Sequence, residues 1–156
     1  MATHRDFISL AKTLGKFSNN IKLTTGQKVQ AIGNKIIEGV ADITPKDTGR
    51  ATYAWQVEFD SPPASSNIEK RDTPPVNADT AAAELKTRGK AKIKDFKYPI
   101  NSMLYVTNYL DYMQYLDRGW SDQAPANFIK GIVVAAVAGT RHIKVTPNPL
   151  YPNVLE

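Results

Sequence analysis

Residues 107–129 read TNYLDYMQYLDRGWSDQAPANFI, and this stretch holds the clearest structural signals in the chain. The apolar run that leads into it, residues 103–106, is rich in aromatic and β-branched side chains and predicts a strand. A short helix should follow, because apolar residues then recur at the three- and four-residue intervals of one helix face. Those residues are Tyr109, Tyr112, Met113 and Leu116.

The second half of the stretch contains a helix stop and a helix start. Arg118 and Gly119 should end the short helix, because glycine tolerates the left-handed conformation and a basic residue suits the negative end of the helix dipole. Pro125 should open a longer helix, since proline has no N–H to lose in a first turn. This helix is predicted to continue to about Ala138 and to stop at Gly139.

The first third of the chain predicts two helices and a strand. One apolar stripe predicts a strong helix over residues 25–41, and a weaker pattern predicts a helix over 4–17. The stripe of the strong helix consists of Val29, Ile32, Ile36, Val40 and Ile43. After a Pro-, Asp- and Gly-containing turn at 44–50, clean alternation of apolar and polar side chains predicts a strand over 52–59.

Two further elements and three polar segments complete the pattern. A helix is predicted over 81–88, capped by Asp79 and Thr80 and stopped by Gly89, and a last short strand over 141–145. A Pro/Ser-rich surface loop is expected at 61–77, an N-terminal arm at 1–24 and an extended Pro-rich tail at 146–156. The 156 residues therefore predict a single α+β domain, with a small antiparallel sheet packed against two main helices.

Composition argues against most enzyme chemistry. The chain has no cysteine, and His4 and His142 have no carboxylate neighbours at ligand spacing. Asp111 and Asp117 would lie on different sides of a helix, and Asp122 sits where an acid favours a helix start. We expect no catalytic site, no cofactor and no metal. Neither a secretory signal nor a membrane span is visible, which predicts a soluble protein made in the cytoplasm.

The formal net charge of +5 is concentrated in one basic run at residues 86–97. Its candidate contacts to DNA are Lys86, Arg88, Lys90, Lys92 and Lys94. If the run is extended, the alternating lysines would project from one side and could neutralise successive phosphates without reading bases. The alternative is a solvated loop whose charge only aids solubility.

The aromatic residues also have two interpretations. Trp55 has the alternating spacing of a core strand, whereas Trp120 follows a loop glycine and Tyr115 lies off the apolar side of its short helix. Exposed tryptophan and tyrosine commonly anchor protein interfaces. Tyr112, Tyr115 and Trp120 are therefore the candidate interface residues, with burial in the core as the alternative for Trp120.

The order of these motifs resembles the head-tail joining and tail-completion family of tailed bacteriophages. The resemblance covers roughly residues 25–140. Its most specific parts are the Thr-Pro-x-Asp-Thr-Gly turn from Thr44 to Gly49 and the block from Asn108-Tyr109-Leu110 to Gln123-Ala124-Pro125. Asp117 stands where glutamate is expected, and Asn127 where glycine is common, so the subfamily is left open.

The resemblance implies a small α+β structural protein of the virion neck. Such a subunit assembles with copies of itself into a ring, six-fold or twelve-fold, between neighbouring connector and tail-tube proteins. Double-stranded DNA passes through the lumen without sequence-specific contacts. In such a ring the basic run could face DNA, and charge reversal at Lys90, Lys92 and Lys94 should then impair assembly while leaving the monomer folded. The alternatives are a non-enzymatic basic nucleic-acid-binding domain and a metal-dependent hydrolase that uses the Asp111 to Asp122 region.

Overall fold

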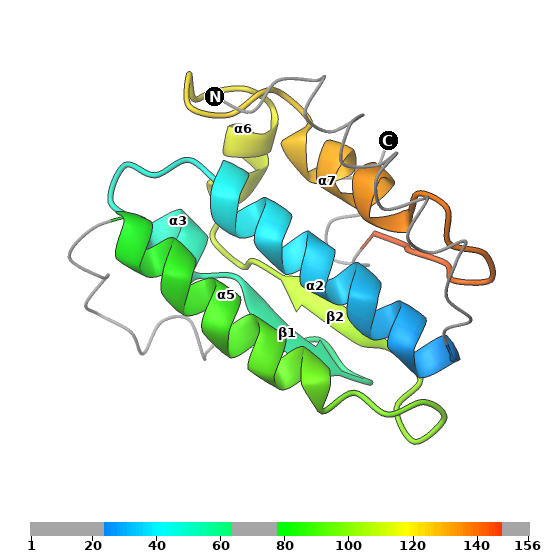
Figure 1. Cartoon of the computed structure of the whole chain (residues 1–156). Helices are drawn as coiled ribbons and strands as arrows, with labels where there is room; N and C mark the ends of the chain where they lie inside the picture. Colours follow the sequence, from blue (N-terminus) through cyan, green and yellow to red (C-terminus); the bar gives the residue numbers. More distant parts are fainter. Residues whose placement is uncertain (1–23, 64–77, 148–156) are drawn as a thin grey trace.

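The computed structural model describes residues 24–63 and 78–147, which form five helices and a two-stranded sheet (Figure 1). The helices are α2 (Thr25–Ile43), α3 (Arg50–Tyr53), α5 (Ala78–Lys94), α6 (Met113–Asp117) and α7 (Phe128–Val137), and the strands are β1 (Gln56–Phe59) and β2 (Leu104–Thr107). This architecture confirms the small α+β fold. The predicted helix at 4–17, most of the 61–77 loop and the tail from 148 onward lie outside the described residues.

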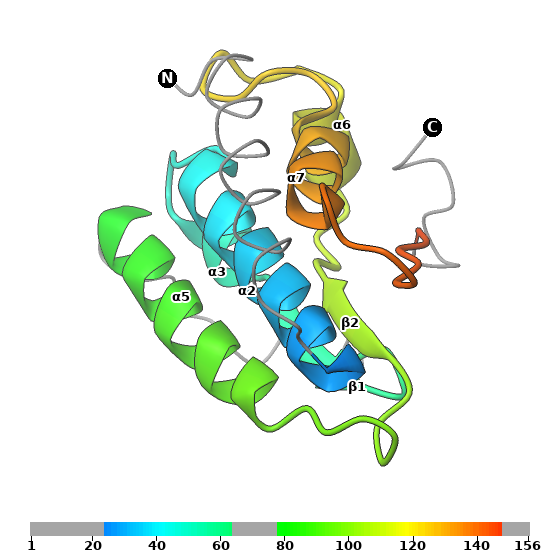
Figure 2. The ribbon, with the colours of Figure 1, turned by 45° about the vertical axis from the view of Figure 1, so that its right-hand side comes forward.

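Helix α2 is the central element, and its start follows from a capping box. The N–H of Gln27 donates to Thr24 Oγ1 (3.3 Å), and the N–H of Thr24 donates to Gln27 Oε1 (3.0 Å). The helix lies between α5 on one side and α7 on the other, and both strands run beneath it (Figures 1 and 2). Of its predicted stripe, Ile32, Val40 and Ile43 are buried, whereas Val29 and Ile36 are partly exposed.

Helix α5 runs antiparallel to α2 and is longer than predicted. Gly89 was expected to stop it, yet the helix continues through Gly89 to Lys94. A Cβ at Gly89 would come within 2.9 Å of Ile37 Cγ2, so the glycine permits close packing of the two helices instead of ending one. The basic run is consequently helical, and its extended alternative is wrong.

The sheet pairs β1 with β2 in antiparallel register, with Val57 opposite Val106. The prediction for β2 is confirmed to within one residue, but the predicted strand at 52–59 is only half correct, because α3 occupies its first part. Gly49 has a φ of 74°, and its carbonyl accepts from the N–H of Tyr53 (2.9 Å), which closes a helical turn before the strand begins. Thr52 and Ala54, which the alternation placed on the outer face, are consequently buried, and Tyr53 is partly exposed.

Asp60 fastens the end of the sheet. Its own φ is 62°, and its N–H donates to the Met103 carbonyl (2.9 Å), one step beyond β1. Its carboxylate accepts from the backbone N–H groups of Ser102 (2.7 Å) and Met103 (3.1 Å) and from Asn101 Nδ2 (2.9 Å). These hydrogen bonds favour the ionised form and lower the pKa of Asp60 to about 2.

The C-terminal half confirms both stop signals, corrects the boundaries of two helices and contradicts one predicted strand. Gly119 and Gly139 have φ values of 87° and 74° and follow α6 and α7. Helix α6 is shorter than predicted, and α7 begins at Phe128 instead of Pro125. Residues 141–145 are not a strand, because no backbone hydrogen bond joins them to β2 or to another part of the described chain.

Candidate interaction surfaces

The motifs that carry the family resemblance meet at one end of the molecule and hold it together. Asn108 is buried, donates from Nδ2 to the Ala51 carbonyl (2.8 Å) and accepts from the Leu110 N–H (3.2 Å). Gln123 Oε1 accepts from the N–H of Lys46 in the turn after α2 (2.6 Å). These residues therefore act as structural ties between distant segments.

Asp117 has a structural role that its sequence position did not reveal. Asn127, which precedes α7, makes no side-chain capping bond, and Asp117 Oδ1 instead accepts from the Ile129 N–H (2.9 Å) in the first turn. Burial raises the pKa of Asp117, an effect that the bond from Ile129 partly offsets. Asp111 and Asp122 are both exposed. Asp117 thus caps α7.

Trp120 is positioned by the end of α6. The N–H of Trp120 donates to the Tyr115 carbonyl (3.2 Å) and the N–H of Gly119 to the Leu116 carbonyl (3.1 Å). This pair of bonds is the Schellman motif, in which an apolar contact commonly joins the two residues at its ends. Here that contact joins the rings of Trp120 and Tyr115, whose centroids lie 4.8 Å apart and whose planes are tilted by 40°. The aromatic pair is therefore held in a fixed orientation.

We call Tyr112, Tyr115 and Trp120 the aromatic cluster. Trp120 is 75% exposed and Tyr115 39%, so their contact with each other covers only part of each ring. Tyr112 is 38% exposed, and partial burial raises its pKa while the nearby Arg50 lowers it. Trp120 is thus on the surface and not in the core, whereas Trp55 is buried and donates from Nε1 to Thr44 Oγ1 (3.0 Å).

Three of the five candidate DNA-contacting cations pair with acidic side chains of this same chain. Lys86 Nζ lies 2.6 Å from Asp42, and Lys92 Nζ lies 3.1 Å from Glu58. Lys90 pairs with Glu38, one turn along α2 from Asp42. The positive charge of these three residues is thus largely neutralised where α5 packs against α2 and β1.

The remaining two candidates, Arg88 and Lys94, differ from one another. The Arg88 guanidinium faces inward, stacks on the Tyr53 ring at 4.6 Å and donates to the carbonyls of Tyr53 and Trp55, the latter at 2.8 Å. Lys94 is exposed and has no ion pair within the described part of the chain. The sequence could not distinguish these roles, because the residues that the cations contact lie more than thirty positions away along the chain.

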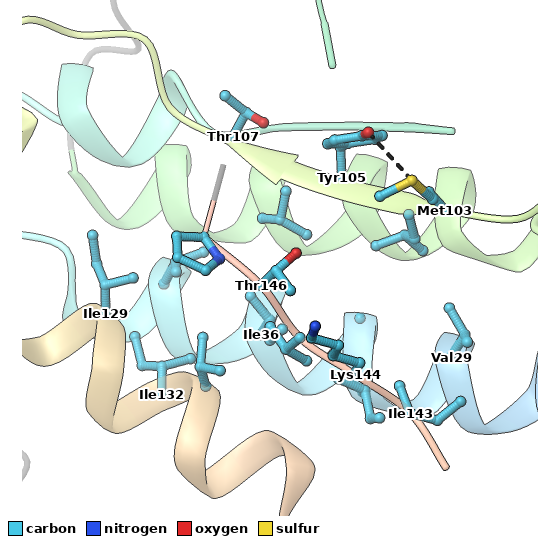
Figure 3. Close-up of a pocket in the computed structure, with 18 of the residues that line it drawn as sticks. Val29, Ile36, Met103, Tyr105, Thr107, Ile129, Ile132, Ile143, Lys144 and Thr146 are labelled. Carbon is cyan, nitrogen blue, oxygen red and sulfur yellow. Dashed lines mark hydrogen bonds between the residues drawn. The ribbon is translucent and has the colours of Figure 1, made fainter. Parts of the chain in front are cut away.

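An apolar groove of about 480 Å³ opens between α2, α7, β2 and the segment after α7 (Figure 3). Sequence reasoning did not find it. The lining side chains include Val29 and Ile36 from α2, Leu104 and Val106 from β2, Ile129 and Ile132 from α7, and Ile143 and Val145. The one sequence signal was the alternation of Ile143 and Val145, which predicted a strand at this place.

Neither a metal cluster nor a membrane span is found in the parts of the chain that the structure describes. Residues 24–63 and 78–147 contain no group of three or more histidine or acidic side chains able to hold a metal ion. No helix there has the length and apolar character needed to cross a membrane. Comparison of the chain with protein-family models, curated proteins and solved structures finds no match.

Proposed function

We propose that this chain is a structural virion protein of a tailed bacteriophage, a ring-forming tail-completion or head-tail connector subunit of the neck. The virion assignment depends on the ordered motifs from Thr44 to Pro125, whose side chains tie the turn after α2 to the segments around α6. In this proposal the copies assemble around a lumen through which DNA passes, and the chain makes or breaks no covalent bond.

The observation that carries the proposal is the exposure of Trp120. A tryptophan that is 75% exposed and fixed against Tyr115 offers a large apolar contact with little conformational entropy left to lose. Tryptophan and tyrosine are enriched at the centres of protein interfaces. The aromatic cluster is therefore the proposed contact between neighbouring subunits.

A free nucleic-acid-binding domain has less support. Nucleic-acid binding needs side-chain cations that can neutralise phosphates and displace the counterions around DNA. Three of the five candidate cations are already paired with acidic side chains. A gel shift across salt concentrations distinguishes the two functions, because only a true binder shows steeply salt-dependent affinity for short duplexes as a monomer.

Sedimentation velocity of the purified chain tests the self-association. The wild type should form an oligomer, and Trp120→Ala should weaken it. The dissociation constant of the oligomer should rise at least tenfold, the equivalent of about 1.4 kcal/mol. Ile100→Ala is the control, because Ile100 is 82% exposed and belongs neither to the aromatic cluster nor to the lining of the groove. Equal oligomerisation of Trp120→Ala and the wild type would remove the aromatic cluster from the proposed interface.

A further inference from the structure

The outer edge of β2 has unpaired backbone groups. In an antiparallel ladder, every second residue directs its backbone N–H and C=O groups toward the partner strand. The hydrogen bond from the Asp60 N–H to the Met103 carbonyl shows that Met103 is one of these residues, so Leu104 is not. Leu104 and Val106 therefore point their N–H and C=O groups away from β1. Within the described chain these groups have no hydrogen-bond partner, and the sheet has no third strand.

This edge opens into the apolar groove. The side chains of Leu104 and Val106 pack against the core and line the groove, opposite Ile36 of α2 and Ile132 of α7. An unpaired strand edge beside an apolar groove is the arrangement used in strand addition, where backbone bonds supply affinity and alternate side chains enter pockets.

The segment 143–146 has the properties of the missing strand. Ile143 and Val145 are partly buried while Lys144 and Thr146 are exposed, which is the alternation of a half-buried strand. Figure 3 shows the segment in the groove, running in the same general direction as β2, from the side of Met103 toward the side of Thr107. No backbone hydrogen bond nevertheless joins it to β2.

A short connection to α7 explains why the segment does not pair within its own chain. The Thr140 N–H donates to the Val137 carbonyl (3.0 Å), and both Gly139 and His142 have positive φ, at 74° and 69°. This tight turn holds residues 143–146 on the α7 side of the groove. Donation to another copy would free the segment from that constraint, because Gly139 can act as the hinge.

We propose that residues 143–146 of one copy add as a third strand to the β2 edge of a second copy. The donor segment and the acceptor edge are different surfaces of one chain, so the contact is head-to-tail and closes into a ring when the rotation between copies permits. This inference deepens the proposed function and depends on its self-association, but it concerns a surface separate from the aromatic cluster.

Disulfide trapping tests the exchange directly, because the chain has no cysteine of its own. In an added strand with Ile143 and Val145 toward the core, Lys144 lies on the same sheet face as Tyr105. Mixed Tyr105→Cys and Lys144→Cys proteins should form a disulfide-linked heterodimer under mild oxidation. Tyr105→Cys mixed with Lys94→Cys, an exposed position on α5, is the control and should not.

The double variant Tyr105→Cys/Lys144→Cys distinguishes exchange from closure within one chain. Exchange predicts linked dimers and higher species, whereas an internal disulfide in a monomer would overturn the proposal. Absence of any cross-link in a sample that sedimentation shows to be oligomeric would overturn this inference alone. A sample that stays monomeric at every concentration would overturn both this inference and the proposed self-association.

Single proline substitutions supply a second test with its own control. Only every second residue of an added strand donates to its neighbour, so proline should be tolerated at one of positions 144 and 145 and not at the other. We expect about a tenfold or greater loss of association for one of Lys144→Pro and Val145→Pro, with both proteins folded by circular dichroism. Unchanged association in both variants would contradict strand addition.

Discussion

Gly119 and Trp120 illustrate how far single residues can be interpreted from sequence. The glycine was predicted to end α6, and its φ of 87° confirms this. The exposure of Trp120 was left open, because a tryptophan after a glycine can fold back into the core or stay outside. The two Schellman bonds decide the matter, since they direct the indole onto Tyr115 at the surface.

Asp60 was not singled out by sequence, because its hydrogen-bond donors lie about forty residues further along the chain at Asn101, Ser102 and Met103. A lone aspartate before a Pro-rich loop predicts only a turn. Its positive φ of 62° and its fourfold hydrogen bonding emerge once β1 and β2 are side by side.

Asp60→Asn should destabilise the protein in a pH-dependent manner. The pKa of Asp60 is lowered from 3.8 to about 2 on folding, so its ionised form stabilises the fold at pH values above about 4. That contribution is lost as the pH falls from about 4 to about 2, because the carboxylate then becomes protonated in the folded state as well. The difference in free energy of unfolding between wild type and Asp60→Asn, measured by urea titration, should therefore shrink across this range. A difference that is constant from pH 6 to pH 2 would show that the carboxylate is not responsible.

At the level of elements, local periodicity predicted α2, β2 and α7, but it did not predict the length of α5 or its packing against α2 and β1. A glycine and a run of cations indicated the end of a helix and an exposed segment. The structure places Gly89 against Ile37 and pairs Lys86, Lys90 and Lys92 with acids on α2 and β1. These partners are 34 to 52 residues away in sequence, by the numbering of the paired residues, so no local pattern could reveal them.

The pairing of Lys90 with Glu38 changes the expected effect of charge reversal. Lys90→Glu places two carboxylates together between α5 and α2 and should lower the free energy of unfolding by roughly 0.5 to 1 kcal/mol. Glu38→Lys in the same chain should restore it, because the pair is then reversed. Lys94→Glu, which breaks no ion pair in the described part of the chain, should stay within about 0.5 kcal/mol of the wild type.

Urea denaturation of these three proteins is the measurement, and an unaltered unfolding midpoint in Lys90→Glu would show that the pair contributes nothing. The earlier expectation that reversal at Lys90, Lys92 and Lys94 spares the monomer is accordingly revised. Lys94→Glu is the variant that probes DNA contact without disturbing the fold.

The packing of α2 against α7 gives a second prediction, with two glycines as a matched pair. A Cβ at Gly39 would come within 2.6 Å of Ile132 Cγ2, whereas a Cβ at Gly131 of α7 meets nothing within 4 Å. Gly39→Ala should therefore destabilise the protein by about 1 to 3 kcal/mol through overpacking. Gly131→Ala should stabilise it by up to about 1 kcal/mol through helix propensity. Thermal unfolding of both variants checks the pair, and destabilisation by Gly131→Ala would contradict the packing described here.

On the scale of the whole molecule, the fold presents two separate apolar surfaces. The aromatic cluster lies at the end of α6, and the groove lies between α2, α7 and β2. A contact between residues 143–146 of one copy and the β2 edge of the next joins the copies head to tail, and such contacts close into a ring when the rotation between copies permits. Only the aromatic cluster was predicted from sequence, since a groove depends on how four segments pack together.

The measurement that tests ring formation most directly is native mass spectrometry of the purified chain over a range of concentrations. Ring formation predicts one dominant species whose mass is a fixed multiple of 17.2 kDa and which does not grow further as concentration rises, because a closed ring leaves no free contact. A 17.2 kDa monomer at every concentration would contradict self-association, and an open-ended series of masses would contradict closure into a ring.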